Sequence, residues 1–163
     1  MYLYRREHLS NYSWGAGPSG IRDKEKAAFQ TIVDALGIEP CEHSPTLNVE
    51  VCVAYWRKAN AIHGYIVREH GGGVDKCQSI YLTRNDLKVL RDKCDEILCV
   101  PANFMPNVAE KCGLNTVEGF FFGSTDYDEW YTDDLKRTVN QIDKILESTS
   151  EDSWTDFIYR ASW

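Results

Sequence analysis

The sequence predicts an α+β fold that is mainly helical, with about four helices and a short antiparallel pairing of strands from the two termini. Apolar residues recur at helical spacing through most of the interior of the chain, and they alternate with polar residues at both ends. At 163 residues, of which 43% are hydrophobic, the chain is long enough for a single domain, 1–163, with a substantial core.

Alternation at the two ends predicts the strands. Tyr2 and Tyr4 fall on one side of a short strand at the start of the chain. The last ten residues alternate more clearly and place four apolar side chains on one face: Phe157, Tyr159, Ala161 and Trp163. A strand at each end favours an antiparallel pair that joins the termini.

Two helices are predicted in the first half of the chain. The first begins at a cap, Ser19 or Asp23, and runs to about Leu36, where Gly37 ends it. The second covers residues 48–70 and ends at the three glycines that follow. Gly is a common residue just past a helix end, so both boundaries rest on the same signal.

A third helix is predicted to begin after Thr83, with Asp86 completing a capping box, and to end before Pro101. Its buried row consists of five apolar residues: Leu87, Leu90, Cys94, Ile97 and Leu98. The segment 99–119 is predicted to be a loop. Residues 120–122, three phenylalanines, are predicted to form a short buried strand or a hydrophobic staple.

The fourth helix is predicted to start at Ser124 or Thr125 and to run to about Glu147. Its apolar stripe is long: Tyr127, Tyr131, Leu135, Thr138, Ile142 and Ile145. A stripe at this spacing is typical of a helix that packs one face against a core.

The charge balance narrows the classes of partner. The formal net charge is −7 and the sequence pI is about 5.1, whereas domains that bind duplex nucleic acid are usually basic. Bulk nucleic acid is therefore disfavoured, but a small anion held by a few local cations is not. The absence of a signal-peptide pattern and of an apolar run near ~20 residues predicts a soluble cytoplasmic protein without a membrane partner.

The six cysteines are expected to be reduced thiols in that compartment. Cys41 and His43 form a close pair, but no second pair has the spacing of a zinc site. Neither a metal nor another cofactor is therefore expected.

A glycine-rich segment, residues 15–20, spells G-x-G-x-x-G. A dinucleotide site needs this pattern after a hydrophobic strand, but here it follows S-N-Y-S-W and contains Pro18. It therefore predicts a turn into the first helix. Arg22 and Lys24 follow it, which leaves open a weak anion site at that helix start.

Residues 55–63, Y-W-R-K-A-N-A-I-H, combine aromatic, cationic, amide and imidazole side chains. On a helical wheel the predicted helix 48–70 has one core face: Val51, Tyr55, Ile62 and Ile66. The opposite face carries Trp56, Arg57, Asn60 and His63, and Lys58 lies toward the edge of the first face, where it is free to snorkel to solvent.

The mixed face has two interpretations. Its groups either join two helices through buried polar contacts or face a ligand, and burying them costs several kcal/mol unless each finds a partner. In the ligand interpretation Trp56 stacks on a base, while Arg57 and Lys58 neutralise phosphate. Asn60 and His63 orient the ligand, and Asn60 is suited to reading an adenine-like edge.

Residues 119–131, G-F-F-F-G-S-T-D-Y-D-E-W-Y, form a second dense stretch. In a structural interpretation its three acids pair with Arg57 or Lys58: Asp126, Asp128 and Glu129. In the functional alternative Tyr127 and Trp130 are aromatic walls of a pocket. The hydroxyls of Ser124 and Thr125 are then hydrogen-bonding groups of the same pocket.

These two stretches and the terminal S-W resemble a family of small phage and prophage proteins of uncharacterised function, over residues 50–163. Two positions depart from the family pattern: G-Y-I at residues 64–66 replaces an aromatic pair after the histidine, and A-S-W replaces a terminal S-S-W. Residues 1–47 are interpreted as a lineage-specific addition, and 48–163 as the family core.

The resemblance implies a phage accessory protein that acts in the bacterial host cytoplasm, where it counters host defence or redirects host metabolism. It supplies no reaction. It singles out the following positions: Trp56, Arg57, Lys58, Asn60, His63, Phe122, Gly123, Ser124, Thr125, Tyr127, Asp128, Trp130 and Tyr131.

Three functions follow as hypotheses. The first is a non-catalytic binder that sequesters a small nucleotide-like anion, with Tyr127 and Trp130 closing the pocket. The second is a protein-binding inhibitor of a host defence factor. The third is an enzyme acting on a nucleotide, with His63 and Asp128 as acid and base. A homodimer is the expected assembly.

Overall fold

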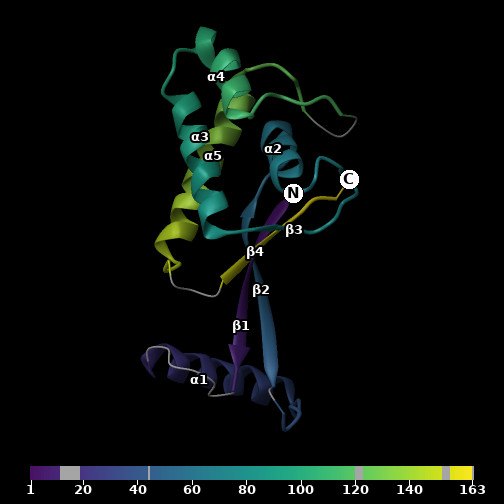
Figure 1. The fold of residues 1–163 in the computed structure, drawn as a ribbon, viewed down its shortest axis with the longest axis vertical. Coiled ribbons are helices and arrows are strands. Elements are labelled where there is room, and N and C mark those ends of the chain that lie inside the picture. Colours follow the sequence, from purple (N-terminus) through teal and green to yellow (C-terminus); the bar gives the residue numbers. More distant parts are fainter. Residues whose placement is uncertain (12–18, 44, 120–122, 152–154, 163) are drawn as a thin grey trace. The chain divides into compact units, whose positions relative to one another are not determined.

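The computed structural model describes residues 1–11, 19–43, 45–119, 123–151 and 155–162. The α+β class is confirmed, with a four-stranded antiparallel sheet and a larger helical part. In chain order the elements are β1 (Tyr2–Ser10), α1 (Ser19–Leu36), β2 (Thr46–Tyr55), α2 (Asn60–His70), β3 (Ile80–Leu82), α3 (Arg84–Leu98), the 3₁₀ turn η1 (Ala102–Phe104), α4 (Met105–Cys112), α5 (Glu129–Glu147) and β4 (Thr155–Arg160) (Figure 1).

The predicted pairing of the terminal strands is confirmed. The sheet order is β2-β1-β4-β3, so β1 and β4 are neighbours, and β3 pairs antiparallel with β4 with Ile80 opposite Tyr159. Phe157, Tyr159 and Ala161 are buried as the alternation predicts. Ile158, on the other face of β4, is buried as well. Trp163 lies outside the described residues.

The chain divides into two compact units, which are considered separately. The larger comprises Met1–Arg5 and Val51–Trp163, and the smaller comprises Arg6–Glu50. The sequence instead sets 1–47 apart from a core of 48–163 within one domain. The first five residues join the larger unit because they open β1, a strand whose sheet neighbour on one side is β4.

The smaller unit consists of α1 with the adjoining parts of β1 and β2. The predicted helix ending at Leu36 is confirmed, and Gly37 follows it with a φ of +62°. Phe29 and Val33 are its buried side chains among the described ones. The glycine-rich turn expected before this helix falls largely on residues outside the described ranges.

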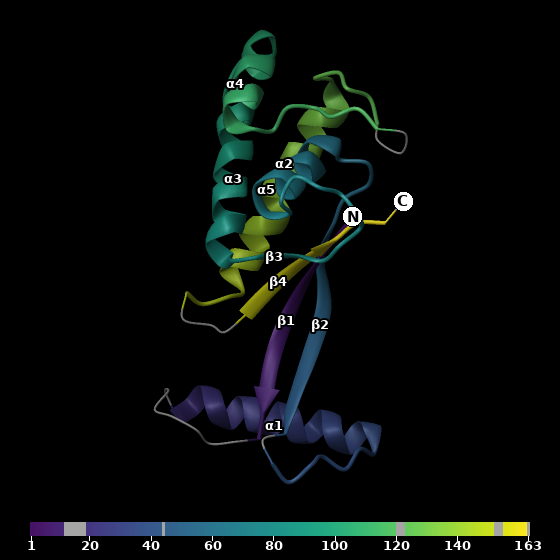
Figure 2. The ribbon, with the colours of Figure 1, turned by 45° about the vertical axis from the view of Figure 1, so that its right-hand side comes forward.

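The core of the larger unit is built where α3 lies along α5 (Figures 1 and 2). The apolar row of α3 is confirmed, with Leu98 only partly buried. The capping box is also present, because Thr83 Oγ1 accepts from the Asp86 N–H and Asp86 Oδ2 accepts from the Thr83 N–H. Each fully buried leucine in this core contributes about 1.5–3 kcal/mol through removal from water.

The predicted helix 48–70 is wrong, since its first third is strand β2. The segment T-L-N-V-E-V-C-V-A-Y places valine at every second position, and β-branched residues favour an extended backbone. A turn over 56–59 follows, in which Lys58 has a φ of +61°. That left-handed conformation cannot continue a helix, so α2 starts only at Asn60.

Two further boundaries differ from the prediction. The expected loop 99–119 contains η1 and α4, and Gly113, with a φ of +72°, ends α4. Helix α5 starts at Glu129 rather than at residue 124 or 125, because Asp128 is its N-cap and accepts a hydrogen bond from the Tyr131 N–H at 3.0 Å. The buried stripe predicted for α5 is confirmed from Tyr131 to Ile145. Residues 120–122 lie outside the described ranges.

Within the described part of the chain, none of the helices has the length and apolar character needed to cross a lipid bilayer.

Candidate functional site

A pocket of about 580 Å³ opens between the β2–α2 turn and the first turns of α5, entirely within the larger unit. A volume of this size suits a nucleotide-sized ligand. Its floor is apolar and its rim is charged. The described residues that line it are Arg57, Lys58, Ala59, Asn60, Ala61, Ile62, Thr116, Gly123, Ser124, Asp128, Trp130, Tyr131, Asp134, Leu135 and Arg137.

The β2–α2 turn supplies two of the cations. Trp56, just before them, is anchored in the core, and its N–H donates to the Met1 carbonyl at 3.0 Å. The left-handed backbone of Lys58 then reverses the chain into α2. Arg57 and Lys58 are thereby left exposed at the rim. Such strain in a residue other than glycine costs of order 1 kcal/mol and is often kept at ligand sites.

Helix α5 supplies the opposite side of the pocket. Trp130, Asp134 and Arg137 stand at positions i, i+4 and i+7, so they follow one face of the helix over about 10 Å. Trp130 is 78% exposed. An indole left in water beside a pocket offers a flat surface for stacking.

The three rim cations have no hydrogen-bond or ion-pair partner within the described ranges, although the charge of Arg137 acts on nearby Asp134. No hydrogen bond or ion pair reaches the side chain of Arg57, Lys58 or Arg137 there, whereas Arg91 pairs with Asp143 at 2.9 Å. The pairing expected between Arg57 or Lys58 and the acids near 126–129 is therefore wrong. Asp128 is instead occupied as the cap of α5.

Asp134 is the pocket's unusual acid. Removal from water raises the pKa of this half-buried carboxyl to about 6, and the nearby charges of Asp133 and Asp128 raise the pKa further, while Arg137 lowers it. No described residue donates a hydrogen bond to its oxygens. Perturbed carboxyls in concave sites are candidate functional groups.

Replacing Asp134 by Asn is expected to stabilise the protein by about 1–2 kcal/mol at pH 8, after allowance for solvent screening. The folded-state pKa of Asp134 lies above its unfolded value of 3.8. Its contribution to stability is therefore fully present below pH 3.8 and is lost as the pH rises through 6. Urea titrations of both proteins between pH 4 and 8 measure the difference in their free energies of unfolding. A difference that does not increase with pH contradicts the prediction.

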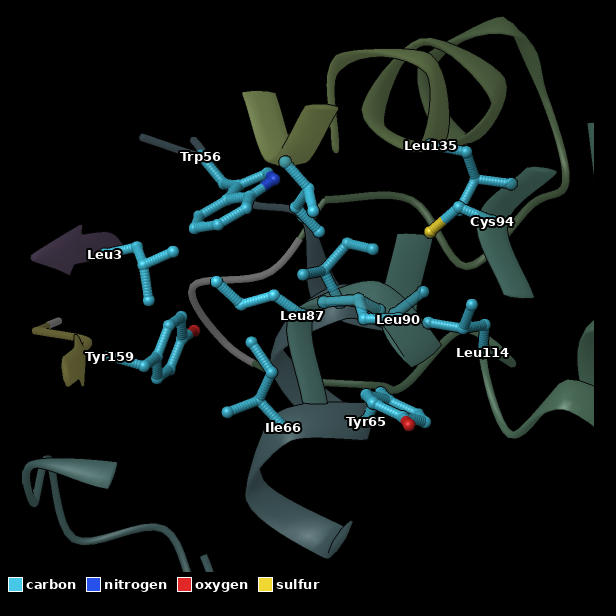
Figure 3. Packing of buried hydrophobic residues seen from close by; sticks show 14 of the residues in the cluster. Leu3, Trp56, Tyr65, Ile66, Leu87, Leu90, Cys94, Leu114, Leu135 and Tyr159 are labelled. Atoms are coloured by element: carbon cyan, nitrogen blue, oxygen red, sulfur yellow. The ribbon is translucent and has the colours of Figure 1, made fainter. Parts of the chain in front are cut away.

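Trp56 does not line the pocket. Only 1% of its surface is exposed, and its indole Nε1–H donates to Thr138 Oγ1 at 2.8 Å. Figure 3 shows it among the core side chains, near Leu3 and Tyr159. The expectation that Trp56 stacks on a ligand base is wrong, because the turn after β2 directs this ring into the core instead of along a helix face.

Asn60 lines the pocket, and both ends of its side-chain amide form hydrogen bonds within the protein. Its Nδ2 donates to the Ser124 carbonyl at 2.9 Å, and its Oδ1 accepts from the Val117 N–H at 3.3 Å. The amide therefore joins α2 to two loop segments. One donor and one acceptor of the amide are thus used within the fold, which disfavours the adenine-reading role that the sequence suggested.

His63 is buried at 3% exposure and lies away from the pocket lining. Its Nδ1 is 2.7 Å from the Tyr159 hydroxyl and its Nε2 is 2.9 Å from Asp75 Oδ2. A neutral ring protonated at Nε2 satisfies both contacts. Burial lowers the pKa of His63, against the opposing effect of Asp75. His63 is thus part of a buried hydrogen-bond chain and does not share the pocket with Asp128.

Of the second predicted stretch, Ser124 and Trp130 line the pocket, and Thr125 and Tyr127 do not. The Ser124 hydroxyl accepts from the Asp126 N–H, and the Thr125 carbonyl accepts from Thr116 Oγ1. Tyr127 packs edge-on against Tyr131, with ring centroids 4.8 Å apart.

Five of the residues predicted to bind a ligand therefore line the pocket: Arg57, Lys58, Asn60, Ser124 and Trp130. Three more positions that the resemblance singles out also line it: Gly123, Asp128 and Tyr131. Asp134 and Arg137 were missed by the sequence reasoning. Their spacing from Trp130 places all three residues on one face of α5, but only the tertiary structure shows that this face lines a pocket. Among the described His, Cys, Asp and Glu side chains, no group of three or more is placed to hold a metal ion.

Comparisons of the chain with protein-family models, with curated proteins and with solved structures find no match. The resemblance to small phage and prophage proteins stays a prediction.

Proposed function

We propose that this chain is a non-catalytic binder that sequesters a small, nucleotide-like anion in the pocket between the β2–α2 turn and α5. The observation that carries the proposal is the group of rim cations Arg57, Lys58 and Arg137, whose side chains form no hydrogen bond or ion pair with any described residue. They gather at one pocket of a protein whose net charge is −7.

The chemistry of the rim fits a phosphate-bearing ligand. A guanidinium forms two parallel hydrogen bonds to phosphate oxygens, and an ammonium adds a mobile point charge. Trp130, largely exposed beside these cations, provides a surface for a base, and such stacking is worth about 1–3 kcal/mol. The apolar floor with Ile62 and Leu135 excludes water beneath the ligand.

The proposal extends to the biological setting that the resemblance implies. A phage accessory protein that removes a nucleotide signal from the host cytoplasm acts against host defence. Sequestration needs tight binding but no reaction, and the acid–base pair considered from the sequence, His63 and Asp128, does not line one pocket. A homodimer stays the expected assembly.

A protein-binding inhibitor is the second candidate, and the exposure of Trp130 favours it. Tryptophan and arginine are enriched among residues that dominate protein interfaces. In this alternative the host factor covers Trp130 and Arg137 of α5, and the pocket itself stays without a small ligand.

Replacing both Arg57 and Lys58 by Ala is expected to weaken nucleotide binding by at least about tenfold, with greater loss at low salt. Calorimetry with a panel of cyclic and linear nucleotides measures the affinity. Lys136→Ala is the matched control, because Lys136 lies on α5 outside the pocket and pairs with Asp133. Its affinity should equal that of the unmodified protein.

Three outcomes of the calorimetry distinguish the candidate functions. Heat of binding followed by recovery of the intact nucleotide after denaturation supports sequestration, and recovery of a product points to an enzyme. No heat from any nucleotide in the panel contradicts the proposal and leaves the protein-binding inhibitor as the better explanation.

A further inference from the structure

Asp134 is out of place in a simple anion site. Its carboxylate lines the same pocket as three cations, and at neutral pH it repels a phosphate that comes close. Phosphate binding alone does not require a carboxylate at position 134, and an Asn there avoids the cost of burying a charge.

Within the described part of the chain, the Asp134 carboxylate is also an acceptor without a donor. An ionised carboxylate accepts hydrogen bonds on two oxygens and donates none. No described residue donates to the side-chain carboxylate of Asp134, although the carboxylate of Asp128, in the same lining, accepts from the Tyr131 N–H. A ligand that compensates the burial of Asp134 must therefore present N–H or O–H groups to it.

Among the common nucleobases, guanine alone presents two adjacent donors. Its ring N1–H and its exocyclic amino group point in the same direction along the Watson–Crick edge and match the two oxygens of a carboxylate. Adenine and cytosine place a ring nitrogen acceptor beside the amino group, so the second carboxylate oxygen faces a lone pair. Uracil has one donor between two carbonyls.

The arrangement on α5 suits a stacked base. Trp130 and Asp134 are four residues apart, so their side chains are neighbours on one helix face, with Cβ atoms about 5–6 Å apart. A base lying on the indole turns an edge toward the next turn of the helix, where Asp134 stands. Asn60, the residue suited to adenine, has both ends of its amide engaged.

We infer that the pocket selects a nucleotide with a guanine-type base, whose two adjacent donors bind the Asp134 carboxylate while the base stacks on Trp130. This inference rests on the proposed function. Arg57 and Lys58 then take the phosphate. Arg137, one turn beyond Asp134, supplies a positive charge that favours the ionised carboxylate needed to accept both bonds.

The test measures the affinities of GMP, IMP, XMP and AMP by calorimetry, with the cyclic forms of the guanine and adenine nucleotides beside them. GMP should bind about 10- to 100-fold more tightly than AMP, as expected for one bidentate contact. IMP lacks the exocyclic amino group and should fall between them. XMP, which carries a carbonyl there, should bind weakly.

Asp134→Asn separates base selection from phosphate binding. The amide retains one acceptor and gains a donor, so the variant should lose the preference for GMP and bind XMP more tightly than the unmodified protein does. Replacing both Arg57 and Lys58 by Ala should weaken the binding of all four nucleotides by similar factors. Unfolding curves confirm that each variant is folded, and Asp134→Asn is expected to be the more stable form.

The results distinguish failure of the inference from failure of the proposed function. Equal affinity for GMP and AMP, a preference for AMP, or an unchanged GMP preference in Asp134→Asn overturns the guanine inference while nucleotide binding stands. No binding of any nucleotide by the folded protein overturns both.

Discussion

Trp56→Ala should lower the free energy of unfolding by about 3–5 kcal/mol, as measured by urea or guanidinium titration. The substitution leaves a large cavity, because the indole is 1% exposed and packs with Tyr159 in the core of the larger unit. It also removes the donor to the Thr138 hydroxyl, which itself donates to the Asp134 carbonyl.

Trp130→Ala is the matched control for this loss. Trp130 is 78% exposed, so its removal should change stability by no more than about 0.5 kcal/mol while weakening nucleotide binding. The Trp56 variant thus reports on folding, and the Trp130 variant reports on ligand binding. Similar stability losses in both variants, or normal stability in Trp56→Ala, contradict the positions assigned to the two rings.

His63→Ala should lower the free energy of unfolding by about 2–4 kcal/mol, the second-largest effect expected. The substitution removes the partner of a buried Tyr159 hydroxyl, and an unsatisfied buried hydroxyl adds its desolvation penalty to the cavity term. His43→Ala, at an exposed position, should be nearly neutral. In a double-mutant cycle with Tyr159→Phe, the combined loss should be smaller than the sum of the single losses.

The same histidine predicts a pH dependence. Burial holds the folded-state pKa of His63 below its ordinary value of 6.5. Its contribution to stability is therefore present above pH 6.5 and is lost as the pH falls through the lower folded-state value. Unfolding curves between pH 5 and 8 should show that the stability advantage of the unmodified protein over His63→Ala shrinks as the pH falls. A parallel pH profile in the two proteins argues against a buried neutral imidazole.

The sequence predicted those parts of the fold that depend on local periodicity. The stripes of α3 and α5, the cap formed by Thr83 and Asp86, and the terminal strands followed from spacing alone. The error at 48–70 arose because valines at every second position were fitted to a helix of 3.6 residues per turn. An alternation of β-branched residues is the stronger signal for a strand.

That error also produced a wrong grouping of the predicted site residues. A continuous helix groups Trp56 and Arg57 with His63, whereas the turn at Lys58 buries the tryptophan and exposes the arginine. Asp134 and Arg137 were overlooked because a charge on the polar face of an amphipathic helix is ordinary. What distinguishes them is the tertiary placement of α5 against the turn, which no local pattern encodes.

The floor and the rim of the pocket differ in how freely they can change over evolutionary time. Tyr131 and Leu135 line the pocket and also belong to the buried core, so a substitution there damages folding before it alters recognition. The rim side chains, such as Arg57 and Trp130, are exposed and carry little of the folding energy. Under the proposed function, related chains that bind a different ligand should therefore share this floor and differ at the rim, because a few surface substitutions change recognition without loss of folding.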